Sequence, residues 1–168
     1  MANYNDYRAV IKEIPEYTVY YKDYYVKSLA DFLNISLEDN FLQDLSDKVM
    51  NENPDIALTE PDYNVMLYMD GEFRDKDLHC RFCDAVTAAG RDCADYKFTT
   101  LEGATAVTVL HRGAYSKLGE AHAFAQKWIK ENGYKQTGFA RDSAIDGCWN
   151  RDSEEDYLME VQIPVEKR

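Results

Sequence analysis

The chain has 168 residues, 45% hydrophobic and 30% charged, with a net charge of −12 from 19 Lys and Arg against 31 Asp and Glu. This length fits one ordinary domain or two small fused modules, and no apolar run reaches the roughly 20 residues of a membrane helix. The acidic balance argues against nucleic-acid binding, because phosphate neutralisation dominates DNA affinity. The N-terminus shows no signal peptide, so a cytoplasmic location is expected.

The first half predicts strand, helix, strand, strand. The opening segment RAVIKEIPEYTVYYKDYYV is β-branched and aromatic and is broken at Pro15, which suits a strand with a bulge or an edge position. Ser36 followed by Asp39 resembles a capping box, and apolar residues at every fourth position predict a helix over about 37–51. The segment YNVMLYMDG predicts a short strand that ends in an Asp-Gly turn, and DLHCRFCDAV predicts the next strand.

The second half repeats this order. The segment DYKFTTLEGATAVTVLHRG predicts a strand with a glycine interruption. Ser116 can cap the helix that follows, over 117–132, and Gly133 supplies its left-handed end. The apolar stripe of this helix consists of Leu118, Ala121, Ala125, Trp128 and Ile129. A short strand starts in the Gly-Tyr exit, GFARDSAIDG predicts a strand ending in a second Asp-Gly turn, and DYLMEVQIPV predicts the last strand.

The repeated order predicts an α+β fold of two duplicated β-α-β-β modules, about 7–87 and 95–166, within a single domain over 1–168. The modules lack a Pro- or Ser-rich linker, so we expect them to share one antiparallel sheet. Both helices are expected on one face of that sheet, which leaves the other face open.

Four cysteines, Cys80, Cys83, Cys93 and Cys148, raise the question of a metal site, because HCRFC contains a C-x-x-C. This pair lies in a predicted strand, where positions i and i+3 point to opposite faces, and zinc sites need turns and further ligands. Free buried thiols are the expected alternative, so no metal or cofactor is predicted. The histidines at positions 79, 111 and 122 are interpreted as structural or exposed.

Strand alternation predicts which side chains occupy the open face. In the last strand, Met159, Val161 and Ile163 form the apolar row that should pack beneath the helices, so Glu160 faces the other way. The open face is expected to carry Met66, Tyr68, Asp142, Ala144, Leu158 and Glu160. Acids among aromatics and small residues suit a pocket for an apolar cation, whereas the alternative is a face that simply meets water.

Three segments together resemble one known family. VIKEIPEYTV, VLHRGAYSKLGEAHAFAQKWIKENGYKQTG and YLMEVQIPV look like the GyrI-like (gyrase-inhibitor-like) effector-binding domain, which is found in MerR- and AraC-type multidrug regulators and in standalone proteins. The resemblance spans nearly the whole chain and is strongest over 103–165. It implies a small-molecule sensor for bulky, often cationic aromatic compounds, with a ligand groove on the open sheet face.

The resemblance also implies which residues bind the ligand. It carries the acid to Glu160 and as an alternative to Asp142, and it places aromatics at Tyr68, Tyr115, Trp149 and Tyr157. Many members have Arg-Glu-x-Tyr where this chain has Arg141-Asp142-Ser143-Ala144, so the acid is shorter and one aromatic is missing. Arg81 occupies the duplicated position that matches Glu160, and it could neutralise this acid across the groove.

Three functions follow as alternatives. The first is an effector-binding module, partnered by a small molecule and by a DNA-binding domain outside this sequence or a homodimer partner, with no direct contact to nucleic acid or membrane. The second is a hydrolase of reactive aromatic compounds, with Glu160 as general base. The third is a protein-interaction module that resembles the gyrase inhibitors and meets a basic partner through its acidic surface.

Overall fold

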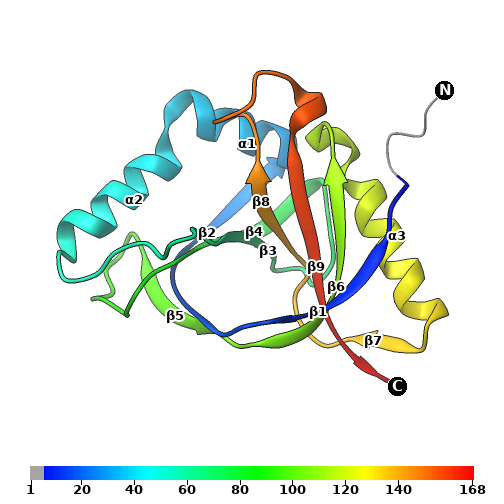
Figure 1. Ribbon diagram of the computed structural model, residues 1–168. Helices are drawn as coiled ribbons and strands as arrows, with labels where there is room; N and C mark the ends of the chain where they lie inside the picture. Colours follow the sequence, from blue (N-terminus) through cyan, green and yellow to red (C-terminus); the bar gives the residue numbers. More distant parts are fainter. Residues whose placement is uncertain (1–5) are drawn as a thin grey trace.

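The protein is an α+β fold built on a curled antiparallel sheet that forms half a barrel (Figure 1). The computed structural model describes residues 6–168, without the side chains of residues 34–38. The strands are β1 (Ala9–Ile14), β2 (Tyr17–Ser28), β3 (Asn64–Tyr68), β4 (Lys76–Ala85), β5 (Lys97–Leu101), β6 (Ala104–Arg112), β7 (Tyr134–Gln136), β8 (Arg141–Asp146) and β9 (Leu158–Lys167). The α-helices are α1 (Leu29–Asp39), α2 (Phe41–Glu52) and α3 (Leu118–Glu131).

Eight strands lie in the order β1-β6-β9-β8-β3-β4-β2-β5, and β7 pairs with the end of β9. Every pairing is antiparallel, so the expected fold class and sheet type are confirmed. Asp70-Gly71 follows β3 and Asp146-Gly147 lies at the end of β8, as expected, and Gly71 has a φ of 104°, which an L side chain rarely adopts. None of the helices in the described part of the chain is long and apolar enough to cross a membrane.

The two ends of the sheet are joined by one continuous ribbon. β1 and β2 follow each other across the bend at Pro15, and β5 and β6 follow each other across Gly103. The pairs run without a change of register from Ala9↔Val109 to Tyr17↔Leu101 and beyond. A Cβ on Gly103 would lie 3.1 Å from the carbonyl oxygen of Ile14, so the close approach of the two bends favours glycine there.

The helical region of the first half differs from the expected single helix. α1 already begins at Leu29, where the Ser28 side chain accepts a hydrogen bond from the backbone N–H of Asp31. α1 and α2 are separated by Asn40, whose φ of 58° is left-handed. The expected start near residue 37 is therefore wrong, because Ser36 lies inside α1; its side chain lies outside the described residues.

Helix α3 lies where the apolar stripe predicts it and ends before Gly133, which has a φ of 76°. Leu118, Ala121, Ala125 and Ile129 are buried as expected. Trp128 is partly buried against the same core and stacks on Tyr134 with 5.6 Å between ring centroids. The N-cap is Lys117 without a side-chain bond, rather than Ser116.

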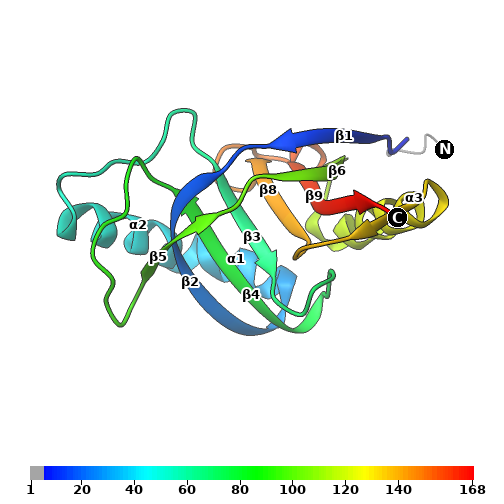
Figure 2. The same ribbon diagram turned by 90° about the horizontal axis from the view of Figure 1, so that it is seen from below.

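Helices α1 and α3 pack on the same face of the sheet. Leu29 and Phe32 of α1 belong to one buried cluster with the α3 stripe and with Met159, Val161 and Ile163 of β9. In Figure 2, α1 lies behind β2 and β4, and α2 continues to the left of β2. We call this the helix side and the opposite face the helix-free face. Cys80 packs on the helix side and Cys83 in the cluster of the helix-free face, and both are free thiols, as the strand spacing predicts.

Candidate functional site

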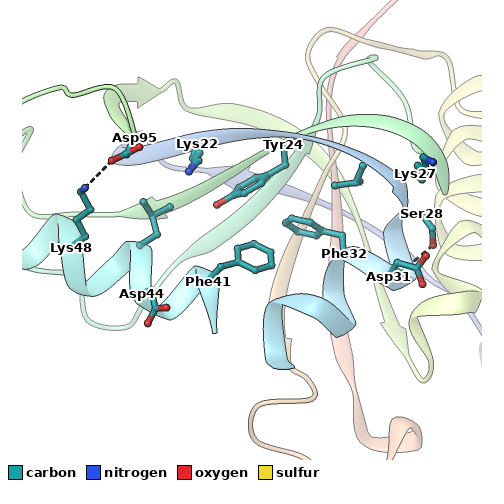
Figure 3. Close-up of a pocket in the computed structure, with 12 residues that line it drawn as sticks. Lys22, Tyr24, Lys27, Ser28, Asp31, Phe32, Phe41, Asp44, Lys48 and Asp95 are labelled. Atoms are coloured by element: carbon teal, nitrogen blue, oxygen red, sulfur yellow. Dashed lines mark hydrogen bonds and ion pairs between the residues drawn. The ribbon is translucent and has the colours of Figure 1, made fainter. Parts of the chain in front are cut away.

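A cavity of about 680 Å³ lies on the helix side of the first half, between β2 and the helices α1 and α2 (Figure 3). Its size is within the usual range for small-molecule pockets. β2 contributes alternate residues, because side chains two positions apart share a face. The left-handed turn at Asn40 separates α1 from α2, so each helix presents its own aromatic residue to the cavity.

Three aromatic rings form the apolar wall of this cavity. Tyr24 lies 5.1 Å from Phe32 and 5.5 Å from Phe41, and the two phenylalanines are 5.4 Å apart, all between ring centroids. The three rings are tilted against one another, as aromatic clusters prefer. Burial raises the pKa of Tyr24 to about 12, so its hydroxyl remains neutral. The wall offers flat, polarisable surfaces to an aromatic ligand.

The rim of the cavity carries charges of both signs. Lys48 and Asp95 neutralise each other at 2.7 Å. The ammonium of Lys22 lies 5.7 Å from the centre of the Tyr24 ring, in the geometry of a weak cation–π contact. The carboxylates of Asp31 and Asp44 also line the cavity, and neither has an ion pair among the described residues. A cation can therefore be held here over a ring and near a carboxylate.

The expected open-face residues of β3 and β8 lie on the helix side instead. Met66, Tyr68 and Ala144 pack with the core beneath the helices, and Asp142 is 1% exposed there. The hydroxyl of Tyr68 donates to Asp142, and His122 of α3 contacts the other carboxylate oxygen of Asp142 at 2.7 Å. Burial, together with the Asp142 charge, raises the pKa of Tyr68 well above its usual value.

On β3 and β8, the alternation of apolar and polar residues did not predict the correct faces, because the centre of the sheet is covered on both faces. Val65 and Leu67, on the opposite row of β3, are as buried as Met66 and Tyr68. Hydrophobicity therefore does not distinguish the two rows. A polar side chain such as Asp142 can lie in the core when its oxygens have partners, as they do here.

Glu160 lies on the helix-free face, as alternation in β9 predicts. One of its oxygens is 2.7 Å from the ammonium of Lys12 on β1, and the other accepts from the Gln162 amide at 2.8 Å. Gln162 in turn accepts from the Tyr63 hydroxyl at 2.7 Å, and the Tyr63 ring stacks on Tyr17. The acid is thus 9% exposed and fully engaged by its own protein.

Arg81 is also on the helix-free face, but it does not neutralise Glu160. Its guanidinium donates two hydrogen bonds to Asp23, at 2.6 and 3.0 Å, and lies 4.3 Å from the centre of the Tyr21 ring. The hydrogen bond from Arg81 lowers the pKa of the Asp23 carboxyl. Leu158 is partly exposed at the start of β9, opposite Asp146 and Arg112.

The three remaining predicted aromatics gather near the loop between β8 and β9. Tyr115 stacks on Tyr157 with 4.9 Å between ring centroids, and the Cys148 backbone N–H donates to the Tyr115 hydroxyl at 3.3 Å. Trp149 is 54% exposed. The ten predicted residues are therefore distributed over both faces of the sheet and this loop.

Sequence reasoning missed the cavity altogether. None of Tyr24, Phe32 and Phe41 was among the candidate site residues, although all three lie within one aromatic-rich stretch. The available signal was the alternation of β2, which puts Lys22, Tyr24 and Val26 on one face. The break at Asn40 had no clear signal in the helical periodicity.

Known proteins match both the sequence and the fold of this chain. The GyrI-like small molecule binding domain family matches residues 9–166. The crystal structure of the EcmrR C-terminal domain is 35% identical, with a TM-score of 0.88, over 98% of this chain and 100% of that one. EcmrR in a cryo-EM structure of its DNA complex is 36% identical, with a TM-score of 0.87 over 96% of this chain. The match spans 58% of that EcmrR chain.

A more distant structure, SAV2435 bound to tetraphenylphosphonium, has a TM-score of 0.54 at 12% identity, over 95% of this chain and 94% of that one, and shares the fold alone. Among curated proteins, no relative matches this chain. The family match covers almost the whole sequence, and the EcmrR effector domain matches from end to end. The chain therefore belongs to the family of GyrI-like small-molecule-binding domains.

Proposed function

We propose that this chain is the effector-binding domain of a transcriptional regulator and binds an aromatic, preferably cationic, small molecule. The observation that carries the proposal is the aromatic cavity between β2, α1 and α2. The likeness to the EcmrR effector domain supports the regulatory setting, since EcmrR is a MerR-family regulator observed on DNA. In this proposal, contact with DNA belongs to a separate domain, in keeping with the charge of −12.

The preference for a cation rests on the contacts of the cavity. The Tyr24 ring already faces the ammonium of Lys22 at 5.7 Å, so the ring face accepts positive charge. An aromatic cation would displace Lys22 from the ring and would be attracted by the carboxylates of Asp31 and Asp44, which also line the cavity. Burial of its flat surface against Phe32 and Phe41 supplies the apolar part of the affinity.

The two halves of the fold, in this proposal, are copies of one β-α-β-β unit. The strand order supports this duplication, because β6-β9-β8 of one half mirrors β2-β4-β3 of the other. The helix-free face with Glu160 remains the alternative place for the ligand, as the family resemblance implies. There Lys12 would have to release Glu160 before a cationic ligand could pair with it.

A calorimetric comparison tests both places. Tetraphenylphosphonium is the cationic probe, and triphenylphosphine oxide is the neutral one. Phe41→Ala should lower the affinity for both probes, because it removes part of the apolar wall. Lys22→Met should raise the affinity for the cationic probe but not for the neutral one, because it removes a competing positive charge.

The control is Glu160→Gln, which should leave both affinities unchanged if the ligand occupies the cavity. If Glu160→Gln weakens the cation and Phe41→Ala does not, the ligand binds on the helix-free face and the cavity assignment fails. If neither probe binds the wild-type protein, the preference for aromatic cations fails.

A further inference from the structure

The helix-free face contains a buried arginine without a counter-charge. Arg141 of β8 is 5% exposed, and its Nε has no hydrogen-bond partner. Among the described residues, no carboxylate forms an ion pair with this guanidinium and no other group accepts a hydrogen bond from it. A buried charge is costly unless it is paired, so a bare guanidinium in an acidic protein needs a partner.

The nearby acids are already engaged. Arg141 lies opposite Gln162 in the β8–β9 register, and Glu160 lies diagonally from it, opposite Ser143. Both oxygens of Glu160 are used by Lys12 and Gln162. The carboxylate of Asp23, three strands further along the same row, is held by Arg81. The unpaired charge of this face is therefore positive.

The surroundings of Arg141 combine apolar and aromatic groups. Leu67 is its direct neighbour on β3, and Val65 lies opposite Ser143 in the next row. The positive charge of Arg141 acts on the buried hydroxyl of Tyr63, whose pKa burial raises to about 12. A guanidinium fork beside apolar side chains and an aromatic ring matches a planar carboxylate with an apolar body.

We propose that Arg141 is the anchor of a second binding site, on the helix-free face, for a small organic monocarboxylate. The site is separate from the aromatic cavity, to which Arg141 does not contribute. A monoanion suits it better than a phosphate dianion, because Glu160 and the net charge of −12 repel a second negative charge. The carboxylate accepts hydrogen bonds from the guanidinium, and its apolar body lies on the partly buried ring of Tyr63, which packs against the cluster of Leu67 and Val65.

The test uses the complete chain with benzoate as probe and benzamide as its neutral counterpart. In NMR spectra of the wild-type protein, the Nε–H signal of Arg141 should move on addition of benzoate and stay in place with benzamide. By calorimetry, Arg141→Gln should lower benzoate affinity about ten- to a hundredfold, the range of a lost charge-assisted hydrogen bond. The matched control is Arg151→Gln, an exposed arginine paired with Asp146, which should leave the affinity unchanged.

Each other outcome overturns the proposal. If the Nε–H signal does not move on addition of benzoate but exchanges with water protons, water is the partner of Arg141. A stronger response to phosphate than to benzoate excludes the monocarboxylate class. If Arg141→Gln does not fold, the NMR titration of the wild-type protein still decides the question. Equal benzoate affinity in the wild type and Arg141→Gln places any benzoate elsewhere, including in the aromatic cavity.

Discussion

The two halves of the sheet are covered in different ways. In the second half, one uninterrupted helix, α3, packs small and branched residues closely on β6 and β9. In the first half, α1 and α2 are broken at Asn40, and their aromatic residues surround a cavity over β2. The continuous helix fills the space over its half of the sheet, whereas the divided helix leaves a cavity over the other half.

The first way to test this comparison is truncation on each side. Leu118→Ala in α3 should lower the free energy of unfolding by about 2–5 kcal/mol, since Leu118 is fully buried. Phe41→Ala in α2 should lower it by only about 1–2 kcal/mol, because Phe41 is partly buried and already borders empty space. Urea unfolding of both variants measures the difference. Equal losses would show that the cavity wall is as tightly packed as the core.

A second test compares the two buried Tyr–Asp pairs. Tyr68→Phe removes the hydroxyl that donates to Asp142, a carboxylate 1% exposed, and should cost about 1–3 kcal/mol of stability. Tyr20→Phe removes a longer bond, 3.2 Å to Asp84, and should cost less. Thermal unfolding of the two variants gives the ranking. A larger loss for Tyr20→Phe would contradict it.

The third prediction concerns pH. Burial and the neighbouring Asp62 raise the pKa of Asp84 from its usual value to about 9. The folded state therefore keeps a proton that the unfolded state releases near pH 4, so this group makes the free energy of unfolding fall as pH rises from about 4 to 9. Asp84→Asn should flatten that dependence and stabilise the protein at pH 8. Asp55→Asn, at an exposed position, is the control that should follow the wild type across the pH series.

The smallest effect concerns the helix starts. Ser28→Ala removes the side-chain cap of α1 and should cost about 1 kcal/mol. Ser116→Ala, before α3, should change stability little, because the N-cap of α3 is Lys117 and makes no side-chain bond. Chemical denaturation of both variants checks this. A comparable loss at Ser116 would reveal a capping role that the structure does not show.

Local signals predicted much of the fold. Pro15, Gly103, Gly133 and the two Asp-Gly turns marked the boundaries of elements, because each depends on a backbone preference of a single residue. Two features of the fold were not predicted. The break at Asn40 interrupts a stretch whose apolar spacing continues across it, and an asparagine in a left-handed conformation is only one of several possibilities. The face of Asp142 depends on Tyr68 and His122, which come from distant parts of the chain.

The site was predicted less well than the fold for the same reason. Glu160 was placed on the correct face, because its strand alternates clearly between apolar and polar residues. Its ion-pair partner Lys12 was not predicted, because Lys12 is 148 residues away in sequence. The aromatic cavity arises from the angle between two helices and a strand, and residue spacing within one element does not encode that angle.

The ribbon that joins β1–β2 to β5–β6 has a consequence for assembly of the chain. Residues 9–21 pair with residues 97–109, so loops of about 75 residues or more must close before the ribbon can form. Such long-range pairing slows folding, and it makes each half dependent on the other. β1, from the first half, covers the outer edge of β6, and β5 covers the outer edge of β2. A fragment containing one half alone would expose an unpaired strand edge, which is a template for aggregation.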